Sequence, residues 1–343
     1  MSEPAQRFRT LLAKVAEAAP LSAAEASDAF DLMMAGEVAP VPIAAFLMAL
    51  RVRGETVEEI SAGAQALRAR MVRVAAPPGA IDTCGTGGDG KETFNISTAA
   101  ALVVAGAGVP VAKHGNRGVS SRSGSSDVLA ALGVNLDADL ALVERSIREA
   151  GVGFLMAPRH HGAMRHVAPV RAELGLRTVF NLLGPLANPA GVKRQLVGVF
   201  DERWLEPLAH VLGRLGAERA WVVHSEDGLD ELATTAPTRV AAWDGGRVRR
   251  FVVTPEEAGL PRAQLADLRG GGPAENALAI RMLLEGAPGA LRDAVILSAA
   301  GALVVAGRAA DLREGAVLAA ASIDEGRAAA ALERMVQITC GRA

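Results

Sequence analysis

The string DTCGTGGDG at residues 82–90 opens the stretch around which this chain is organised. It is followed by KETFNIST at 91–98, an apolar run, KHGNRG at 113–118 and a serine-rich tail. Glycine lets a backbone approach a ligand closely, and successive N–H groups in such a turn form a concave anion site. We therefore expect two phosphate-binding loops that face one another across one apolar segment.

The segment between the two loops is predicted to begin a helix that adds to the anion site. Asn95, Ser97 and Thr98 are residue types that favour the N-cap, and an apolar run follows at 99–102. The N-terminus of a helix carries partial positive charge. Further positive charge near the loops is expected from three basic side chains: Lys113, Arg117 and Arg122.

Neither of two common phosphate motifs assigns the first loop by itself. Residues 85–90 have the spacing G-x-G-x-x-G, which alone is a weak signal, and the chain has no G-x4-G-K-[ST] string. A lone glycine loop is usually only a tight turn. The combination with the strings at 95–98 and 113–117 favours ligand binding over a simple turn.

Length and composition indicate a globular protein with two domains, or one large domain with an appendage. The chain has 343 residues, half of them hydrophobic, and an apolar core of that size needs no disulfide or metal to stabilise it. The formal net charge of −2 argues against nucleic acid or an anionic membrane as the main partner.

The cysteines and the N-terminal sequence predict a cytoplasmic location. Cys84 and Cys340 lack the spacing of metal ligands, so a reducing compartment is the simplest interpretation. The first residues have neither a basic segment nor an apolar one of the kind found in signal peptides. The apolar runs near 96–112 and 294–307 are interrupted and are too short to span a membrane.

The first 72 residues are predicted to form helices only. Capping-box patterns begin at Ser22 and Thr56, and Gly36 and Gly54 lie where helices should end. Apolar residues recur at helical spacing, as in Phe8, Leu11, Leu12 and Val15, and in Ile43, Phe46, Leu47 and Leu50. These apolar stripes fit an internal core or a dimer interface equally well, because both bury the same residue types.

After a linker at 75–79, short β-like runs alternate with helical patterns. Such alternation predicts a largely parallel sheet with helices on both faces. The predicted strands cover 80–83, 109–112, 152–155, 195–200 and 220–224, followed by an edge hairpin of 240–243 and 248–253. The fold class is therefore α/β, with a small all-helical domain at 1–72, a segment returning to it near 170–188, and a larger domain at 73–343.

Ligands of open α/β sheets bind outside the carboxyl ends of the strands, and both glycine loops follow predicted strands. So many backbone donors suit a ligand with two separate phosphate groups. Zinc is disfavoured, since the chain lacks His-Glu-x-x-His and cysteine ligands. Local context favours pocket lining for His114. Four histidines are predicted near this edge of the sheet: His114, His160, His161 and His166.

Two further motifs each allow two interpretations. Asp230 and Glu231 follow a predicted strand, where adjacent carboxylates suit Mg²⁺ but also the solvated start of a helix. Because neighbouring side chains point in different directions, at least one of them should reach a metal through water. Arg171, in a predicted helix, could bind a ligand carboxylate or form an ion pair with Glu173. Residues 180–189 are apolar and turn-rich and could form a hinge.

Taken together, five strings in this chain resemble the anthranilate phosphoribosyltransferase family. They are DTCGTGGD at 82–89, TFNIST at 93–98, KHGNR at 113–117, RAELGLRT at 171–178 and FNLLGP at 180–185. The likeness runs in order over almost the whole chain. Pyrimidine nucleoside phosphorylases also carry a Lys-His-Gly loop, but usually with glycine at the position of Asn116.

The resemblance implies a transferase of tryptophan biosynthesis with a nucleoside phosphorylase-like fold, dimeric through its helical domain. It would join anthranilate to phosphoribosyl pyrophosphate, with Mg²⁺ associated with Ser97, Asp230 and Glu231. Phosphoribosyl pyrophosphate would be held by Gly85, Gly88, Asp89, Thr93, Asn95, Ile96, Ser97, Thr98, Lys113, His114, Gly115, Asn116, Arg117, Gly118, Val119, Ser120, Ser121 and Ser125. Asn116 and Arg171 would contact anthranilate, with Gly85 nearby. The residues lining its approach would be His114, Pro158 and His161.

One departure from the family pattern concerns the loop after the third predicted strand. The family generally has His-Pro-Ala where this chain has His161, Gly162 and Ala163, and glycine is expected to loosen the anthranilate entrance. Two other functions compete with the transferase: a nucleoside phosphorylase, and a non-catalytic relative that binds nucleic acid. Asn116 and Arg171 disfavour the first, and the net charge and intact loops disfavour the second.

Overall fold

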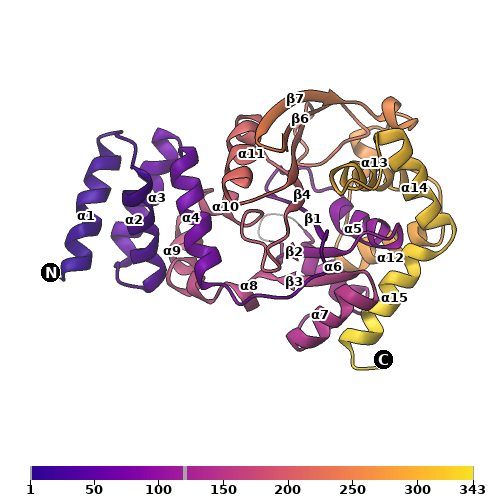
Figure 1. Cartoon of the computed structure of the whole chain (residues 1–343), viewed down its shortest axis with the longest axis horizontal. Helices are drawn as coiled ribbons and strands as arrows, with labels where there is room; N and C mark the ends of the chain where they lie inside the picture. The colour runs from indigo at the N-terminus through magenta and orange to yellow at the C-terminus, as the bar shows by residue number, and fades with distance from the viewer. Residues whose placement is uncertain (1, 119–121, 343) are drawn as a thin grey trace.

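The computed structural model describes residues 2–118 and 122–342, so the predicted ligands Val119, Ser120 and Ser121 lie outside the described residues. Four helices form one end of the molecule, and a sheet flanked by helices forms the rest (Figure 1). The four N-terminal helices are α1 (Glu3–Ala16), α2 (Ala23–Ala35), α3 (Pro40–Arg53) and α4 (Val57–Arg70).

The N-terminal helices begin and end where the sequence predicts. Ser22 Oγ accepts a hydrogen bond from Glu25 N at 3.3 Å, and the Glu25 carboxylate accepts one from Ser22 N at 2.8 Å. The same reciprocal pair opens α4 at Thr56. Gly36 ends α2 with a φ of +76°, and Gly54 follows the last residue of α3. Both capping boxes and both glycine stops are confirmed.

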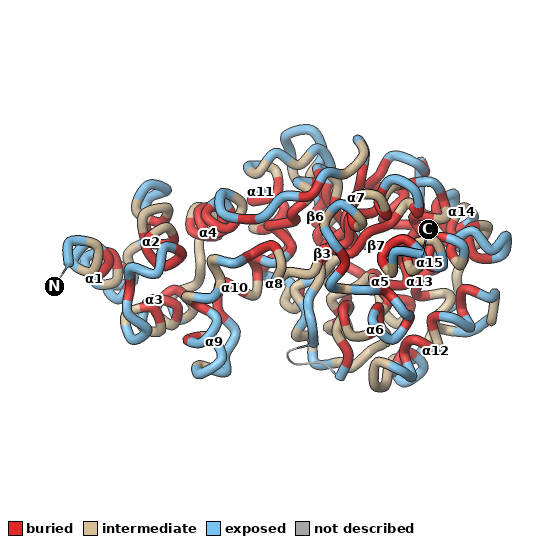
Figure 2. The backbone as a smooth tube through the Cα atoms, turned by 90° about the horizontal axis from the view of Figure 1, so that it is seen from below, coloured by how far each residue is buried: buried red, intermediate tan, exposed pale blue. Residues whose placement is uncertain are grey.

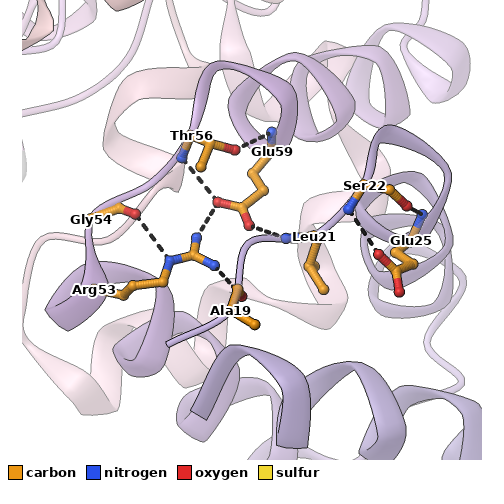
Figure 3. Close-up of polar contacts among 8 residues, drawn as sticks. All are labelled: Ala19, Leu21, Ser22, Glu25, Arg53, Gly54, Thr56 and Glu59. Atoms are coloured by element: carbon orange, nitrogen blue, oxygen red, sulfur yellow. Dashed lines mark hydrogen bonds and ion pairs between the residues drawn. The ribbon is translucent and has the colours of Figure 1, made fainter. Parts of the chain in front are cut away.

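A buried carboxylate ties these helices together (Figure 3). Glu59 accepts hydrogen bonds from Leu21 N at 3.0 Å and Thr56 N at 2.9 Å, and it forms an ion pair with Arg53. Arg53 Nη1 also donates to Ala19 O at 2.7 Å. A buried charge is tolerated when it is paired and its lone pairs are satisfied. The network joins the α1–α2 connection to the α3–α4 turn.

The apolar stripe of α3 forms an internal core. Its members Ile43, Phe46, Leu47 and Leu50 are buried within the single chain. The Phe46 ring lies 5.1 Å from that of Phe8, centroid to centroid. For these four residues the internal alternative is confirmed.

The segment that follows the third strand returns to the helical part. Its helices α9 (Ala168–Leu174) and α10 (Phe180–Leu183) pack against α3 and α4 (Figure 1). Leu183 lies so close to α4 that a Cβ on Gly63 would be 2.9 Å from its Cδ1. This contact explains why α4 carries a glycine in its middle, where glycine weakens a helix.

The larger part contains a seven-stranded sheet in the order β3-β2-β1-β4-β5-β6-β7. The first five strands along the chain pair in parallel, and β6 and β7 form an antiparallel hairpin at the edge, as predicted. The strands are β1 (Ile81–Gly85), β2 (Val111–Gly115), β3 (Val152–Met156), β4 (Arg194–Gly198), β5 (Arg219–Ser225), β6 (Thr238–Asp244) and β7 (Arg247–Val253).

Helices cover both faces of the sheet. Neighbouring residues of one strand enter different cores: Leu196 and Val223 pack with α5 and α13, whereas Val197 and Val222 pack with α11. Figure 2 shows buried chain running through β3, β6, α5 and α13. The helices are α5 (Ile96–Gly106), α6 (Ser125–Ala131), α7 (Leu140–Glu149), α8 (Ala157–His160), α11 (Leu205–Arg214), α12 (Pro273–Leu284), α13 (Ala290–Val305), α14 (Leu312–Asp324) and α15 (Arg327–Thr339), with 3₁₀ helices η1 (Gly162–His166), η2 (Glu202–Trp204), η3 (Pro255–Ala258) and η4 (Leu265–Leu268).

The strand order reverses between β1 and β4, which pair in register with Gly85 opposite Gly198. Such a switch point leaves a crevice at the carboxyl ends of the two strands. The first glycine loop leaves β1 at this place. Within residues 2–118 and 122–342, no helix combines the length and the apolar character needed to cross a membrane.

Candidate active site

The first glycine loop, residues 85–90, is built to meet an acidic loop that follows β5. A Cβ on Gly85 would lie 2.7 Å from Asp230 Oδ2, and one on Gly198 would lie 1.6 Å from Asp230 O. Gly87, with a φ of +63°, donates its N–H to Asp230 Oδ2 at 2.8 Å. Glycine is required at both strand ends so that the two loops can touch.

Asp230 and Glu231 lie in an irregular, partly buried loop and not in a helix. The alternative of a solvated helix start is therefore wrong. Leu229 and Leu232, both fully buried, hold the loop in the core and draw the carboxylates inward. Their apolar spacing is the sequence signal that could have indicated this.

Burial and mutual repulsion disfavour the charged forms of this acidic group. Burial raises the pKa of Asp230 well above its usual range, and the charges of Asp89 and Glu231 raise it further. Burial raises the pKa of Glu231 to about 7, against the opposing effects of Lys113 and of the Ser97 N–H, which donates to Glu231 Oε1 at 3.2 Å. A divalent cation would relieve this repulsion.

Lys113 lies beneath the site and does not project from a loop. Only 3% of its surface is exposed, and its Nζ donates to Thr83 O and lies 3.5 Å from Ser97 Oγ. Its charge lowers the pKa values of Glu231 and Asp82, both of which burial raises. The Lys113 ammonium thus offsets buried carboxylates, whereas the sequence suggested positive charge near a phosphate.

The start of α5 differs in detail from the prediction. Asn95 occupies the N-cap position, yet its side chain makes no capping bond. The Thr98 N–H bonds Asn95 O at 3.1 Å, and the Ile96 side chain is buried in the core. The Ser97 hydroxyl lies near Lys113, as noted above. The Asn95 amide instead contacts Ser123, in the chain that leads into α6.

The described part of the second loop, residues 115–118, folds back on the start of α6. Asn116 O accepts hydrogen bonds from Ser125 Oγ at 3.2 Å and from Ser126 N at 3.3 Å. Gly118 N donates to the Asp127 carboxylate at 3.0 Å. The Asn116 and Arg117 side chains are exposed to solvent.

A buried asparagine that the sequence analysis missed supports the contact between the start of α5 and the chain that leads into α6. Asn276 of α12 donates to Asn95 Oδ1 at 2.9 Å. Asn95 Nδ2 in turn donates to Ser123 O at 3.0 Å. The sequence offered one signal, an amide side chain within the apolar pattern of a predicted helix. Its partner could not be predicted, because Asn95 is 181 positions away and local patterns do not extend that far.

Of the four histidines predicted near this edge, two lie together. His114 Nδ1 is 3.1 Å from Gly184 O, and its Nε2 is 3.2 Å from His161 Nε2. Burial lowers the pKa of His114 to about 3 and that of His161 to about 4, so both are neutral at pH 7. The other two lie apart: His160 Nδ1 contacts Val72 O at 2.8 Å, and the His166 ring packs on Gly36.

Arg171 lies on α9, as predicted, and no ion pair among the described residues includes it, so pairing with Glu173 is wrong. Its guanidinium is 5.5 Å from the centre of the Phe180 ring, and burial lowers its pKa.

Pro158 is exposed in the first turn of α8. A second arginine was missed: Arg177 Nη1 donates to Gly88 O at 2.7 Å and fastens the first loop.

The donor set fits magnesium. No group of three or more histidine, cysteine, aspartate or glutamate side chains is placed for a metal in the part of the chain that the structure describes. Mg²⁺ commonly takes one or two carboxylates and completes its shell with water and substrate phosphate oxygens. Asp230 and Glu231, crowded and partly buried, meet that requirement.

Comparison with known proteins agrees with both parts of the fold. Residues 9–71 match the helical bundle domain of a glycosyl transferase family, and residues 77–329 match its a/b domain. The two matched domains, together with the acidic loop and the glycine loop that meet at the switch point, therefore define a glycosyl-transferring enzyme.

More specific relatives are found over nearly the full length. An anthranilate phosphoribosyltransferase of Paramagnetospirillum magneticum is 62% identical over 97% of this chain and 96% of its own. The crystal structure of the Thermus thermophilus enzyme is similar, with a TM-score of 0.91, 49% identity and coverage of 96% and 99%. The Saccharomyces cerevisiae enzyme in complex with PRPP and Mg has a TM-score of 0.90, 28% identity and 99% coverage of both chains. This chain belongs to the anthranilate phosphoribosyltransferase family.

Proposed function

We propose that this chain transfers the phosphoribosyl group of phosphoribosyl pyrophosphate to the amine of anthranilate, giving N-(5-phosphoribosyl)anthranilate and pyrophosphate in tryptophan biosynthesis. The observation that carries the proposal is the contact between Asp230 and the first glycine loop. It places two carboxylates suited to Mg²⁺ beside backbone amides suited to phosphate, at the switch point of the sheet.

The sugar substrate would lie across the two loops and the start of α5. Backbone donors and small side chains of these segments suit its phosphates. We assign it to Gly85, Gly88, Asp89, Thr93, Asn95, Ile96, Ser97, Thr98, Lys113, His114, Gly115, Asn116, Arg117, Gly118, Val119, Ser120, Ser121 and Ser125. Ile96 and Lys113, being buried, would act through the backbone and through charge respectively.

Asp230 and Glu231, with Ser97, would hold Mg²⁺. When bound, the ion would neutralise charge on the departing pyrophosphate. Its presence would also favour ionised carboxylates, which the metal-free protein disfavours.

Anthranilate would lie near Gly85, Asn116 and Arg171, with the Arg171 guanidinium facing its carboxylate. His114, His161 and Pro158 would line its approach. Because both histidines are neutral at pH 7, they add no charge to this passage.

The reaction is a displacement at ribose C1: the C1–O bond to pyrophosphate breaks, the C1–N bond forms, and the amine then releases a proton to water. An aromatic amine is neutral at pH 7 and attacks through its lone pair, so no strong general base is required. Positioning by the loops and stabilisation of the leaving charge would supply most of the acceleration.

A single-turnover assay tests the proposal. Anthranilate fluorescence should fall only when phosphoribosyl pyrophosphate and Mg²⁺ are both present. A parallel assay with phosphate and a pyrimidine nucleoside should show no turnover. Turnover of the nucleoside, with anthranilate left unchanged, would replace the transferase with a phosphorylase.

We also propose a homodimer formed through the helical domain. The face of α3 opposite its buried stripe carries Val41 and Val52, which are 79% and 83% exposed, with Ala45 and Met48 between them at helical spacing. An exposed apolar stripe of this kind is typical of a contact surface.

The proposed domains are 1–72, with the segment near 170–188, and 73–343. The packing of α9 and α10 against α3 and α4 supports this division. We further propose a cytoplasmic location, which suits the two free thiols, Cys84 and Cys340.

A further inference from the structure

We infer that Asn276 is a positioning residue for the sugar-phosphate substrate, acting through Asn95; this rests on the assignment of Asn95 to that substrate. Asn276 lies in the first turns of α12 and is 1% exposed. Both ends of its amide are used. Oδ1 accepts a hydrogen bond from Gly271 N at 2.7 Å, and Nδ2 donates to Asn95 Oδ1 at 2.9 Å.

Asn95 in turn is bonded to the chain that leads into α6. Its Nδ2 donates to Ser123 O at 3.0 Å, and its Oδ1 also accepts from Ser123 Oγ at 3.2 Å. With three hydrogen bonds from two sides, the Asn95 amide has one orientation that satisfies all its partners. Asn276 therefore fixes the side chain that connects the start of α5 with the chain entering α6.

The backbone around this contact is fitted equally closely. Phe94 N donates to Leu268 O at 3.0 Å, and Gly270 N donates to Glu92 O at 2.8 Å. A Cβ on Gly270 would lie 2.8 Å from Thr93 O. The segment 268–276, which we name the C-terminal brace, therefore supports residues 92–95 through both main chain and side chain.

The donor of Asn276 serves a contact outside its own helix. A buried asparagine that only satisfied its own helix would bond to α12 or to the turn before it, as Oδ1 does with Gly271. The donor of Asn276 instead reaches a residue 181 positions away, at the edge of the proposed phosphate site. Support of a binding side chain by a fixed, buried amide is how such sites are held in geometry.

Calorimetric binding of phosphoribosyl pyrophosphate with Mg²⁺ tests the inference without the acceptor. Asn276→Ala should raise the dissociation constant about tenfold, the effect of losing one buried hydrogen bond. The KM for phosphoribosyl pyrophosphate should rise in parallel. The KM for anthranilate and kcat at saturation should stay within about twofold of wild type, because uniform binding alone is lost.

A double-variant cycle shows whether Asn276 acts through Asn95. If it does, adding Asn276→Ala to Asn95→Ala should weaken binding by no more than about twofold further, since coupled residues are not additive. Ser322→Ala is the matched control, because the buried Ser322 Oγ donates to Val103 O at 2.8 Å, within α5 and away from its start. This control should leave substrate binding unchanged.

Three results would overturn the inference: binding by Asn276→Ala within about twofold of wild type, multiplicative effects in the cycle, or an equal loss in Ser322→Ala. If the alanine variant does not fold, as judged by thermal denaturation, Asn276→Ser replaces it in the same cycle. Wild-type protein that binds the sugar but leaves anthranilate unconsumed would refute the transferase function and leave this test intact.

Discussion

Asp230 Oδ2 accepts a hydrogen bond from Gly87 N at 2.8 Å, joining residues 143 positions apart in the sequence. The contact forms because two strand ends lack side chains, Gly85 in β1 and Gly198 in β4. It brings a carboxylate to the amides that are proposed to bind phosphate. The acidic loop and the first glycine loop therefore form one structural unit, so a substitution in either loop should displace residues of the other.

Gly85→Ala should displace the Asp230 carboxylate, because the new Cβ would lie 2.7 Å from its Oδ2. We expect kcat/KM to fall about 100-fold, the scale of a misplacement of about 1 Å at a reacting site. Near-wild-type turnover by Gly85→Ala would show that the position of Asp230 is unimportant.

Removing both acidic charges should weaken the response to metal. We expect the double substitution Asp230→Asn and Glu231→Gln to raise the half-saturating Mg²⁺ concentration by about 10- to 100-fold in the transferase assay. Asp227→Asn is the matched control, because Asp227 lies in the same loop and bonds Thr235. An unchanged magnesium titration in the double variant would remove both carboxylates from the metal site.

Protons should compete with Mg²⁺ for the Glu231 carboxylate near pH 7. Because burial raises the pKa of Glu231 to about 7, its carboxyl carries a proton below that pH, and the metal must displace it. Metal affinity should therefore fall by up to about tenfold for each pH unit below 7. Calorimetry between pH 5.5 and 8.5 measures this slope, which should be shallower in Glu231→Gln. Equal slopes in the two proteins would mean that a group other than Glu231 causes the pH dependence of metal affinity.

The same raised pKa should affect stability. Between the usual glutamate pKa and about 7, the folded protein keeps a proton that the unfolded chain releases. Its contribution to the free energy of unfolding is then fully present below that window and is lost as the pH rises through it. Thermal denaturation of metal-free wild type and Glu231→Gln should show the difference, and the gap between them should change most between pH 5 and 7. A constant gap would contradict the raised pKa.

The fold was predictable from the sequence because its signals are local. Capping boxes at Ser22 and Thr56 and the continuous apolar strand runs specify their elements within a few residues. The site was predictable only in part. The glycine strings mark the loops, but the partners of Lys113, Asn95 and Asn276 are set by tertiary packing over tens to hundreds of positions. A local sequence pattern therefore cannot predict which distant residue a buried side chain will bond.

Arg171→Ala should raise the KM for anthranilate far more than that for phosphoribosyl pyrophosphate. A lost pair of charge-assisted hydrogen bonds corresponds to about 10- to 100-fold in KM. Arg171→Lys should recover part of this, because a single charge cannot reproduce the bidentate geometry. Steady-state kinetics with each substrate varied in turn decides the point. Equal increases in both KM values would mean that Arg171 supports the fold of α9 rather than the acceptor.

The exposed stripe of α3 should hold the proposed dimer together. Val41→Glu combined with Val52→Glu places two like charges on each subunit at a self-complementary surface, where they would be desolvated and unpaired. Sedimentation should then report a monomer, whereas wild type should report a dimer. Val317→Glu is the control, since Val317 is 65% exposed on α14, outside the helical domain. A monomeric wild type would contradict the proposed dimer. A dimer that survives both substitutions would mean that the interface lies outside this face of α3.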